Sequence, residues 1–185
     1  MSGVIISGDT SGSVTLSAPA VAGSSVLTLP AVSGTVITTG TTGQVIPKAA
    51  LPTGSVLQVV QASVSVGSAY TTATPTSRVS LSITPSATSS KILLMYTAGD
   101  CYSSASTAIL SSAFYKNAAS ILQFTSEIGR NGTVYTAISG QYLDSPATIS
   151  AITYAVYHWN KNATGTTSVG DSAMPSVLTA MEISA

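Results

Sequence analysis

The chain has 185 residues, of which only 6% are charged, and its six basic and six acidic residues give a formal net charge of zero. The lack of any basic run argues against nucleic-acid binding, which depends on phosphate neutralisation. Although 44% of the residues are hydrophobic, the longest apolar runs, such as residues 92–96, are far shorter than the roughly 20 residues of a spanning helix. We therefore expect no membrane insertion. Residues 1–7 also lack the basic flank and apolar length of a secretory signal, so export by the usual route is not expected.

Composition also favours an assembly subunit. A chain with so few charges is prone to associate in solution, and a defined oligomer makes that association harmless. The single cysteine, Cys101, excludes an intrachain disulfide and a cysteine-cluster metal site. We expect Cys101 to be a buried thiol, and we expect no cofactor.

The N-terminal segment contains a near-duplication. Pro-Ala-Val-Ala-Gly at residues 19–23 recurs as Pro-Ala-Val-Ser-Gly at residues 30–34, and each copy follows a short run of aliphatic and hydroxyl residues. Proline removes a ladder donor and glycine permits turns, so the pattern predicts a ribbon of very short strands. The ribbon has no aromatic residue, and it has no charge between Asp9 and Lys48. Because it cannot bury a core alone, we expect other chains to order it.

This pattern divides the chain into an attachment and trimerisation arm (residues 1–46), a linker rich in proline (residues 47–54) and a head (residues 55–185). The arm residues expected to carry attachment and assembly are Val14, Leu16, Pro19, Val21, Val26, Leu29, Pro30, Val32 and Val36.

The first half of the head reads as strands. Residues 60–66 alternate apolar and polar side chains, as a half-buried strand does, and Val79, Leu81 and Ile83 repeat the alternation. Residues 91–96 are instead a continuous apolar run, which predicts a strand buried on both faces. Residues 100–106 are expected to form a loop.

The second half continues in the same way. We interpret residues 107–115 as a strand, because helix caps are missing. Asn-Gly at residues 131–132, between strand-like runs at 121–128 and 133–138, predicts a hairpin. The last two strands are expected at residues 148–159 and 177–183. About eight strands without a helix predict an all-β fold whose head is an antiparallel β-sandwich, and eight strands suggest a jelly roll.

Four blocks of the sequence carry a resemblance. The first block is Gly-Ser-Val-Thr-Leu at residues 12–16 with Ala-Pro-Ala-Val-Ala-Gly at 18–23 and Leu-Thr-Leu-Pro at 27–30. The second block is Leu-Pro-Thr-Gly-Ser-Val-Leu-Gln-Val-Val-Gln at 51–61. The third is Ile-Thr-Pro at 83–85 with Thr-Ser-Ser-Lys-Ile-Leu at 88–93, and the fourth is Tyr-Leu-Asp-Ser-Pro at 142–146 with Met-Glu-Ile at 181–183. In this order the blocks resemble a segment that recurs in tail-fibre and other virion proteins of tailed bacteriophages, particularly those of marine and cyanobacterial hosts.

The resemblance implies a trimeric, β-rich component on the exterior of a virion, made in the host cytoplasm, with an N-terminal attachment region and a C-terminal head. It carries over no catalytic or ligand-binding residue. Fibre proteins of this kind are usually longer, and here the motif begins almost at Met1, which leaves little room for a shaft.

Catalysis has few candidate residues. A Ser-His-Asp arrangement would have to use His158, the single histidine, and no Gly-x-Ser-x-Gly elbow accompanies it. We expect a structural or surface histidine and no metal site. Sugar cleavage would need two facing acids, and we expect the available carboxylates to be solvated in loops. These carboxylates are Asp100, Glu127, Asp144 and Asp171.

Aromatic residues near the end of one strand suggest glycan contact. Tyr157 and Trp159 share one face of this strand, and Tyr154 lies on the other. Packing in the sandwich is the simpler interpretation, but exposed rings could stack on sugars. The loops at residues 100–106 and 160–171 are the expected contact regions. The candidate glycan contacts are Tyr102, Tyr157, Trp159, Asn160 and Asn162.

We therefore expect a non-enzymatic, short fibre-like homotrimer on a tailed-phage virion that contributes to adsorption to host-surface glycan. Its expected partners are its own copies, other virion proteins bound through the arm, and host polysaccharide. The alternative is a capsid decoration protein, and a third hypothesis is a sugar-cleaving enzyme.

Overall fold

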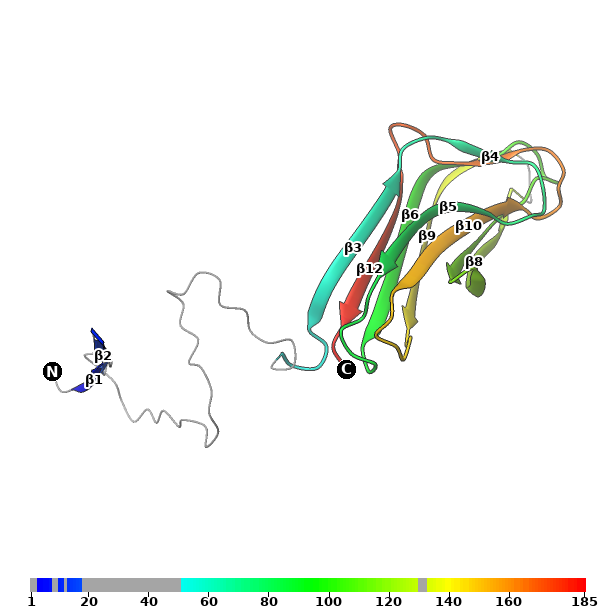
Figure 1. Ribbon diagram of the computed structural model, residues 1–185. Helices are drawn as coiled ribbons and strands as arrows, with labels where there is room; N and C mark the ends of the chain where they lie inside the picture. The colour runs from blue at the N-terminus through cyan, green and yellow to red at the C-terminus, as the bar shows by residue number, and fades with distance from the viewer. Residues whose placement is uncertain (1–2, 8–9, 12, 18–50, 130–132) are drawn as a thin grey trace. The chain divides into compact units, whose positions relative to one another are not determined.

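A computed structural model of the chain describes residues 3–7, 10–11, 13–17, 51–129 and 133–185 (Figure 1). The chain divides into two compact units, Met1–Val45 and Ile46–Ala185. The described residues contain no helix, and all their strand pairings are antiparallel. The prediction of an all-β chain is therefore confirmed for this part of the chain.

The N-terminal unit contains one described hairpin. Strand β1 (Gly3–Ser7) pairs with β2 (Ser13–Ser17), with Val4 opposite Leu16 and Ile6 opposite Val14. The predicted short strand around Val14 and Leu16 is confirmed, whereas β1 was missed. The other predicted attachment residues, Pro19, Val21, Val26, Leu29, Pro30, Val32 and Val36, lie outside the described residues.

The second unit contains ten described strands. Eight have seven residues or more, in agreement with the predicted number, and β4 and β11 have three each. The strands are β3 (Val56–Val64), β4 (Ser68–Tyr70), β5 (Thr76–Ile83), β6 (Lys91–Ser103), β7 (Leu110–Lys116), β8 (Ala119–Ile128), β9 (Val134–Asp144), β10 (Ile152–Asn160), β11 (Thr167–Val169) and β12 (Ser176–Ile183).

These strands form two antiparallel sheets. The six-stranded sheet has the order β3-β12-β6-β11-β4, with β9 on the other edge of β6, and the four-stranded sheet has the order β5-β10-β7-β8. One buried cluster draws its side chains from both sheets, for example Leu94 and Leu178 from the first and Val79, Phe114 and Val156 from the second. The head is thus sandwich-like (Figure 1), and the buried side chains of both sheets form its core.

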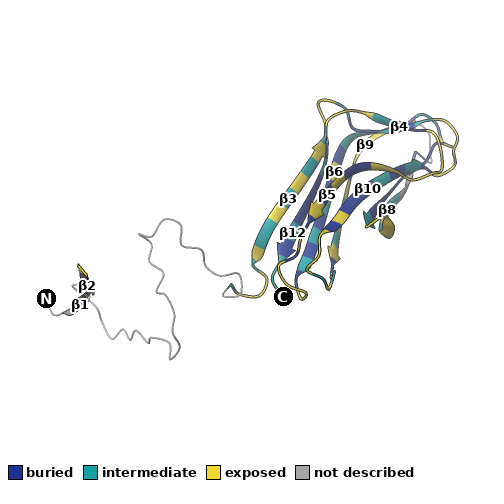
Figure 2. Cartoon of the chain, in the orientation of Figure 1, coloured by how far each residue is buried: buried dark blue, intermediate teal, exposed yellow. Residues whose placement is uncertain are grey.

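Strand β6 corrects one prediction. Ile92, Leu94 and Tyr96 are buried, but Leu93 and Met95, which face the other way, are only half-buried. The expectation of burial on both faces is therefore wrong. The run is continuously apolar because its outer face is apolar as well. Figure 2 shows the contrast between the dark, buried β12 and the neighbouring edge strand β3, which is exposed or half-buried along its length.

The turns correct two further predictions. The hairpin expected around residues 131–132 is wrong, because β8 pairs with β7 in one sheet whereas β9 pairs with β6 in the other. Strands β8 and β9 thus lie in different layers. The hairpin is instead between β7 and β8, through a turn at Asn117 and Ala118 with φ of 47° and 68°. The loop predicted at residues 100–106 is also partly wrong, because β6 continues to Ser103 through a bulge at Asp100.

The two ends of the head differ. The proximal end, where the chain enters, carries residues 51–55, 84–90, 117–118, 145–151 and 184–185. There Gly54 donates its backbone N–H to the carbonyl of Ser184 (2.8 Å), and Ser184 donates to that of Ser55 (2.9 Å). The distal end carries the remaining connections between the strands. The chain therefore enters the head beside its C-terminus, and Figure 1 shows the start of β3 and the C-terminus at the same end.

We predict that Gly140→Ala lowers the free energy of unfolding by about 1–3 kcal/mol, as overpacking does. A Cβ atom at Gly140 would lie 2.7 Å from the ring of Phe124, which packs against Phe114 with ring centroids 4.7 Å apart. This cost exceeds the roughly 0.4–1 kcal/mol that alanine contributes by restricting the unfolded chain. Urea denaturation of both proteins checks the prediction. Ser139→Ala on the exposed side of β9 is the control, and equal effects of the two substitutions would contradict it.

Candidate functional site

Three aromatic side chains gather on the outer face of the four-stranded sheet. Tyr157 and Trp159 come from β10 and Tyr115 from β7, and all three are half-buried. The rings of Tyr115 and Tyr157 stack, with centroids 3.9 Å apart and planes 23° apart. We call Tyr115, Tyr157 and Trp159 the aromatic face.

Small residues on the same side of the sheet make room for these rings. In the register, Tyr157 lies opposite Ala113, Tyr115 opposite Ala155, and Trp159 opposite Ser111. Both alanines and Ser111 are buried although they point away from the core. Burial on an outward face indicates that the aromatic rings cover them. The small residues therefore allow the aromatic side chains to lie along the sheet.

Polar side chains surround the aromatic face. Ser77 lies opposite Tyr157, Ser80 opposite Ala155, and Gln123 opposite Ala113, so all three share its side of the sheet and are exposed. Tyrosine and tryptophan combine an apolar ring with a polar donor. Flat apolar rings bordered by hydroxyl and amide groups suit a ligand with apolar ring faces and hydroxyl edges, which is the chemistry of a sugar.

The structure divides the predicted glycan contacts into separate groups. Tyr157 and Trp159 share a face as predicted, and Tyr154 is buried on the other. Tyr102 lies on the six-stranded sheet instead, where its ring packs against Tyr135 with centroids 4.9 Å apart. Asn162 is exposed at the distal end, and its amide donates to the carbonyl of Thr107 (3.1 Å).

Asn160 is a correction. Its side chain is fully buried. The amide oxygen accepts from the backbone N–H of Ile109 (3.2 Å), and the amide nitrogen donates to the carbonyls of Thr164 (2.9 Å) and Gly165 (3.3 Å). Asn160 therefore closes the loop that follows β10 and is not available to a ligand. The reverse error concerns Tyr115, which sequence analysis missed because only strand pairing brings it beside Tyr157.

His158 is structural, as predicted. It is fully buried, with Nε2 2.8 Å from the hydroxyl of Tyr96 and Nδ1 2.7 Å from that of Ser112. Burial lowers the pKa of His158 to about 3, and the positive charge of Arg78 adds to this shift. The imidazole is therefore neutral at physiological pH and is enclosed by two hydroxyl groups. Cys101 is also buried as predicted, and burial raises the pKa of its thiol to about 11.

The acidic candidates do not form a matched pair. Asp144 is buried in a strand, not solvated in a loop as expected, and it accepts from Lys116 (2.7 Å) and from the hydroxyl of Tyr154 (2.5 Å). Asp144 lies opposite Ile92, and Asp100 lies eight residues further along β6, so about 25 Å of strand separates the two. Glycosidases need carboxyl groups about 5–10 Å apart. Asp171 closes a local turn through Ala173 and Met174, and the side chain of Glu127 lies outside the described residues.

Sequence analysis did not identify Glu182 as a functional or structural residue. Its carboxylate is fully buried and accepts from the Gln58 amide (2.6 Å), the Ser86 backbone N–H (2.6 Å), the Ser86 hydroxyl (2.5 Å) and the Ser90 hydroxyl (2.7 Å). Burial acts to raise the pKa of Glu182, but the hydrogen bonds from Ser86, Ser90 and Gln58 outweigh it and lower the pKa to about 2. Sequence offered no signal, because the donors come from distant segments.

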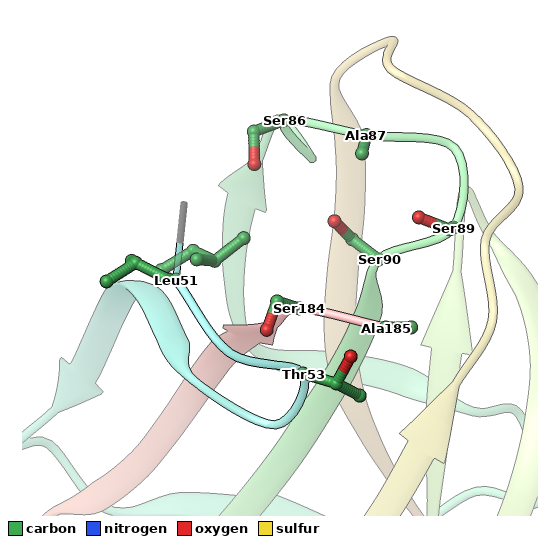
Figure 3. Close-up of a pocket in the computed structure, with 9 residues that line it drawn as sticks. Leu51, Thr53, Ser86, Ala87, Ser89, Ser90, Ser184 and Ala185 are labelled. Atoms are coloured by element: carbon green, nitrogen blue, oxygen red, sulfur yellow. The ribbon is translucent and has the colours of Figure 1, made fainter. Parts of the chain in front are cut away.

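A pocket of about 340 Å³ lies beside this carboxylate at the proximal end (Figure 3). Leu51 and Thr53 line it from the segment before β3, the loop at residues 86–90 from a second side, and Ser184 and Ala185 from a third. The hydroxyl groups of Ser86 and Ser90 already bond to Glu182. The pocket thus marks where three segments meet, and its lining holds no ionisable side chain.

The described residues offer neither a metal-binding cluster nor a membrane-spanning helix. The described part of the chain has no cluster of three or more His, Cys, Asp or Glu side chains that could hold a metal ion. Within the same residues, we find no helix with the length and apolar character to cross a membrane. No protein-family model matches the chain, and its sequence matches none of the curated proteins.

We predict that alanine substitutions at the adjacent residues Ser111 and Ser112 have different effects on the free energy of unfolding. Ser112→Ala leaves Nδ1 of the buried His158 without its hydroxyl partner, which should cost about 1–3 kcal/mol of unfolding free energy. Ser111 is also fully buried, but its hydroxyl has no hydrogen-bond partner within the described structure. Ser111→Ala should therefore be neutral or stabilising. Urea denaturation compares the two, and a larger loss for Ser111→Ala would contradict the assignment.

We predict that acid destabilises the head in two stages. The pKa of His158 is lower in the folded chain than the usual 6.5. Its unfolded state therefore binds more protons, and stability falls as the pH drops from about 6.5 toward 3. The pKa of Glu182 is also lowered, from 4.5, so its contribution is complete above about pH 4.5 and is lost as the pH falls toward 2.

Unfolding free energies measured between pH 8 and pH 3 check this prediction. The decline attributed to His158 has a limiting slope of about 1.4 kcal/mol per pH unit. His158→Asn should abolish the decline between about pH 6.5 and 4.5, and Glu182→Gln should lessen the decline below pH 4.5. A wild-type stability that stays constant from pH 7 to 5 is incompatible with the prediction.

Proposed function

We propose that this chain is a non-enzymatic structural component on the exterior of a tailed-phage virion, and that it is a short fibre-like homotrimer whose head binds host-surface glycan. The observation that carries the glycan-binding proposal is the aromatic face. Tyr115, Tyr157 and Trp159 lie together on one sheet, above buried small residues and beside exposed serine and glutamine side chains.

The strand connectivity supports a jelly-roll head. The eight long strands form the orders β3-β12-β6-β9 and β5-β10-β7-β8. Along the chain every connection between long strands crosses from one sheet to the other, except that between β7 and β8. Double-sheet jelly rolls of eight strands are found in viral capsid and lectin domains. The connectivity is thus compatible with both the proposed location and the proposed ligand.

The two ends of the head suit presentation on an arm. The chain enters the head at the proximal end, next to Ser184. Trp159 lies at the other end of β10, one residue before that strand finishes. A head held from its proximal end would therefore carry the Trp159 part of the aromatic face away from the attachment point. The resemblance of the four sequence blocks to phage fibre proteins is the reason for proposing a place on a virion.

Capsid decoration is the alternative role on a virion. Electron microscopy of intact particles labelled against this chain separates the two locations. Label at the tail supports the fibre proposal, whereas label over the capsid contradicts it and supports decoration.

We predict that Tyr157→Ala combined with Trp159→Ala weakens glycan binding by about 5- to 150-fold. Each lost aromatic contact is worth about 0.5–1.5 kcal/mol, so the two together are worth about 1–3 kcal/mol, and 1.4 kcal/mol is tenfold in the dissociation constant. The full chain would be titrated with lipopolysaccharide or capsular polysaccharide purified from a bacterium that the phage infects. Because both rings are half-buried, circular dichroism must show that the variant remains folded.

The matched control is Tyr135→Ala on the other sheet, where Tyr135 is 71% exposed. It should bind as the wild type does. An equal loss of binding affinity in Tyr135→Ala and in the double variant would show that the aromatic face is not the binding site. A wild type that binds no host polysaccharide would contradict the proposed function.

A further inference from the structure

The outer face of the six-stranded sheet carries a row of large apolar side chains. Met181 of β12 lies opposite both Val59 of β3 and Leu93 of β6, and Leu93 lies opposite Leu143 of β9. Val59 is 55% exposed and Leu143 is 53% exposed, whereas Met181 and Leu93 between them are half-buried. We call these four residues the apolar row. Four neighbouring strands thus present apolar side chains at one level, on the side opposite the core.

The row belongs to the proximal half of this face. Toward the proximal end the next position of β12 on this side is Ile183, which pairs with Val56, and Val56 is 53% exposed. Toward the distal end the next level mixes Met95 with Gln61, Thr179 and Gln141. The apolar surface therefore concentrates where the chain enters the head. Large apolar patches of this kind mark interaction surfaces.

Charge limits what can cover this face. Among the outward positions of the paired parts of β3, β12, β6 and β9, Lys91 is the one side chain that carries a charge at neutral pH, and its Nζ donates to the hydroxyl of Ser145 (2.7 Å). A charged partner would therefore bury charges without counter-charges, which is costly. A neutral apolar partner matches the face. A second copy of this chain offers such a surface, since its own face is identical and nearly uncharged.

The size of the face is adequate for association. Strands about 4.8 Å apart and about 3.3 Å of rise per residue give four strands of eight paired positions a face of roughly 19 Å by 26 Å, or about 500 Å² before side-chain relief is counted. A standard interface buries about 800 Å² of accessible surface per partner. The face is thus of the right order for an interface between copies, with the apolar row near its proximal side.

We propose that copies of this chain associate through the outer face of β3, β12, β6 and β9, with the apolar row at the contact. The inference deepens the proposed function, because it names the surface that would hold the homotrimer together. Strand β3 begins at Val56, four residues after Pro52, which lies at the proximal end of the head. Arms that associate at that end would bring the apolar halves of these faces toward one another.

The test compares charged substitutions on and off the face. Val59→Glu combined with Leu143→Glu places two like charges in the proposed contact on each copy. Val66→Glu combined with Ile149→Glu places the same two charges at apolar residues that are 72% and 60% exposed outside it. The mass of each full-length protein would be measured by analytical ultracentrifugation over a micromolar range, and circular dichroism would report folding.

We expect the wild type and the Val66/Ile149 variant to sediment as three times the 18.5 kDa chain mass. The Val59/Leu143 variant should remain folded but associate at least tenfold more weakly. A Val59/Leu143 variant that keeps the wild-type assembly would overturn the interface and leave the homotrimer standing. A monomeric wild type would overturn both the interface and the homotrimer. That result would also be expected if residues 1–50 of the same chain covered the apolar row. Glycan titration of the same variants tests the aromatic face independently.

Discussion

The Glu182 carboxylate holds together segments of the head that are far apart in sequence. It lies on β12 and accepts from Gln58 on β3 and from Ser86 and Ser90 in the connection between β5 and β6. That connection joins the two sheets, so the carboxylate fixes both the β3 to β12 pairing and the point where the chain changes layer. The charge is balanced by hydrogen bonds alone within the described structure. Such a buried carboxylate stabilises only while all its donors are in place. Both outer faces depend on this arrangement, because it positions the sheets that carry them.

With the sheets fixed in this way, the two outer faces have different chemistry. One presents stacked aromatic rings bordered by hydroxyl and amide groups, and the other presents aliphatic side chains and methionine with almost no charge. We therefore propose that ligand binds to the four-stranded sheet and that copies associate through the six-stranded sheet. Such an assembly would leave the aromatic face accessible.

Local patterns predicted much of the fold, and the failures have physical reasons. The alternation of Val79, Leu81 and Ile83 indicated a strand with one buried face, and the structure has it. The continuous run at residues 91–96 was misread because an apolar outer face and a second buried face give the same sequence. The prediction of a hairpin at residues 131–132 was wrong because turn chemistry does not show which sheet receives the next strand. Tyr115, Asn160 and Glu182 were misjudged or missed, since each has a partner that is distant in sequence, with 51 positions between Ile109 and Asn160 and 96 between Ser86 and Glu182.

Trp159 provides the most direct test, because it is the one tryptophan of the chain and lies on the aromatic face. Its intrinsic fluorescence can be followed while the full-length protein is titrated with host-surface polysaccharide. If sugars stack on this face, the emission of Trp159 will shift in a saturable way, with the same midpoint as binding measured by calorimetry. Saturable binding that leaves the Trp159 emission unchanged would show that the ligand sits elsewhere and would contradict the account.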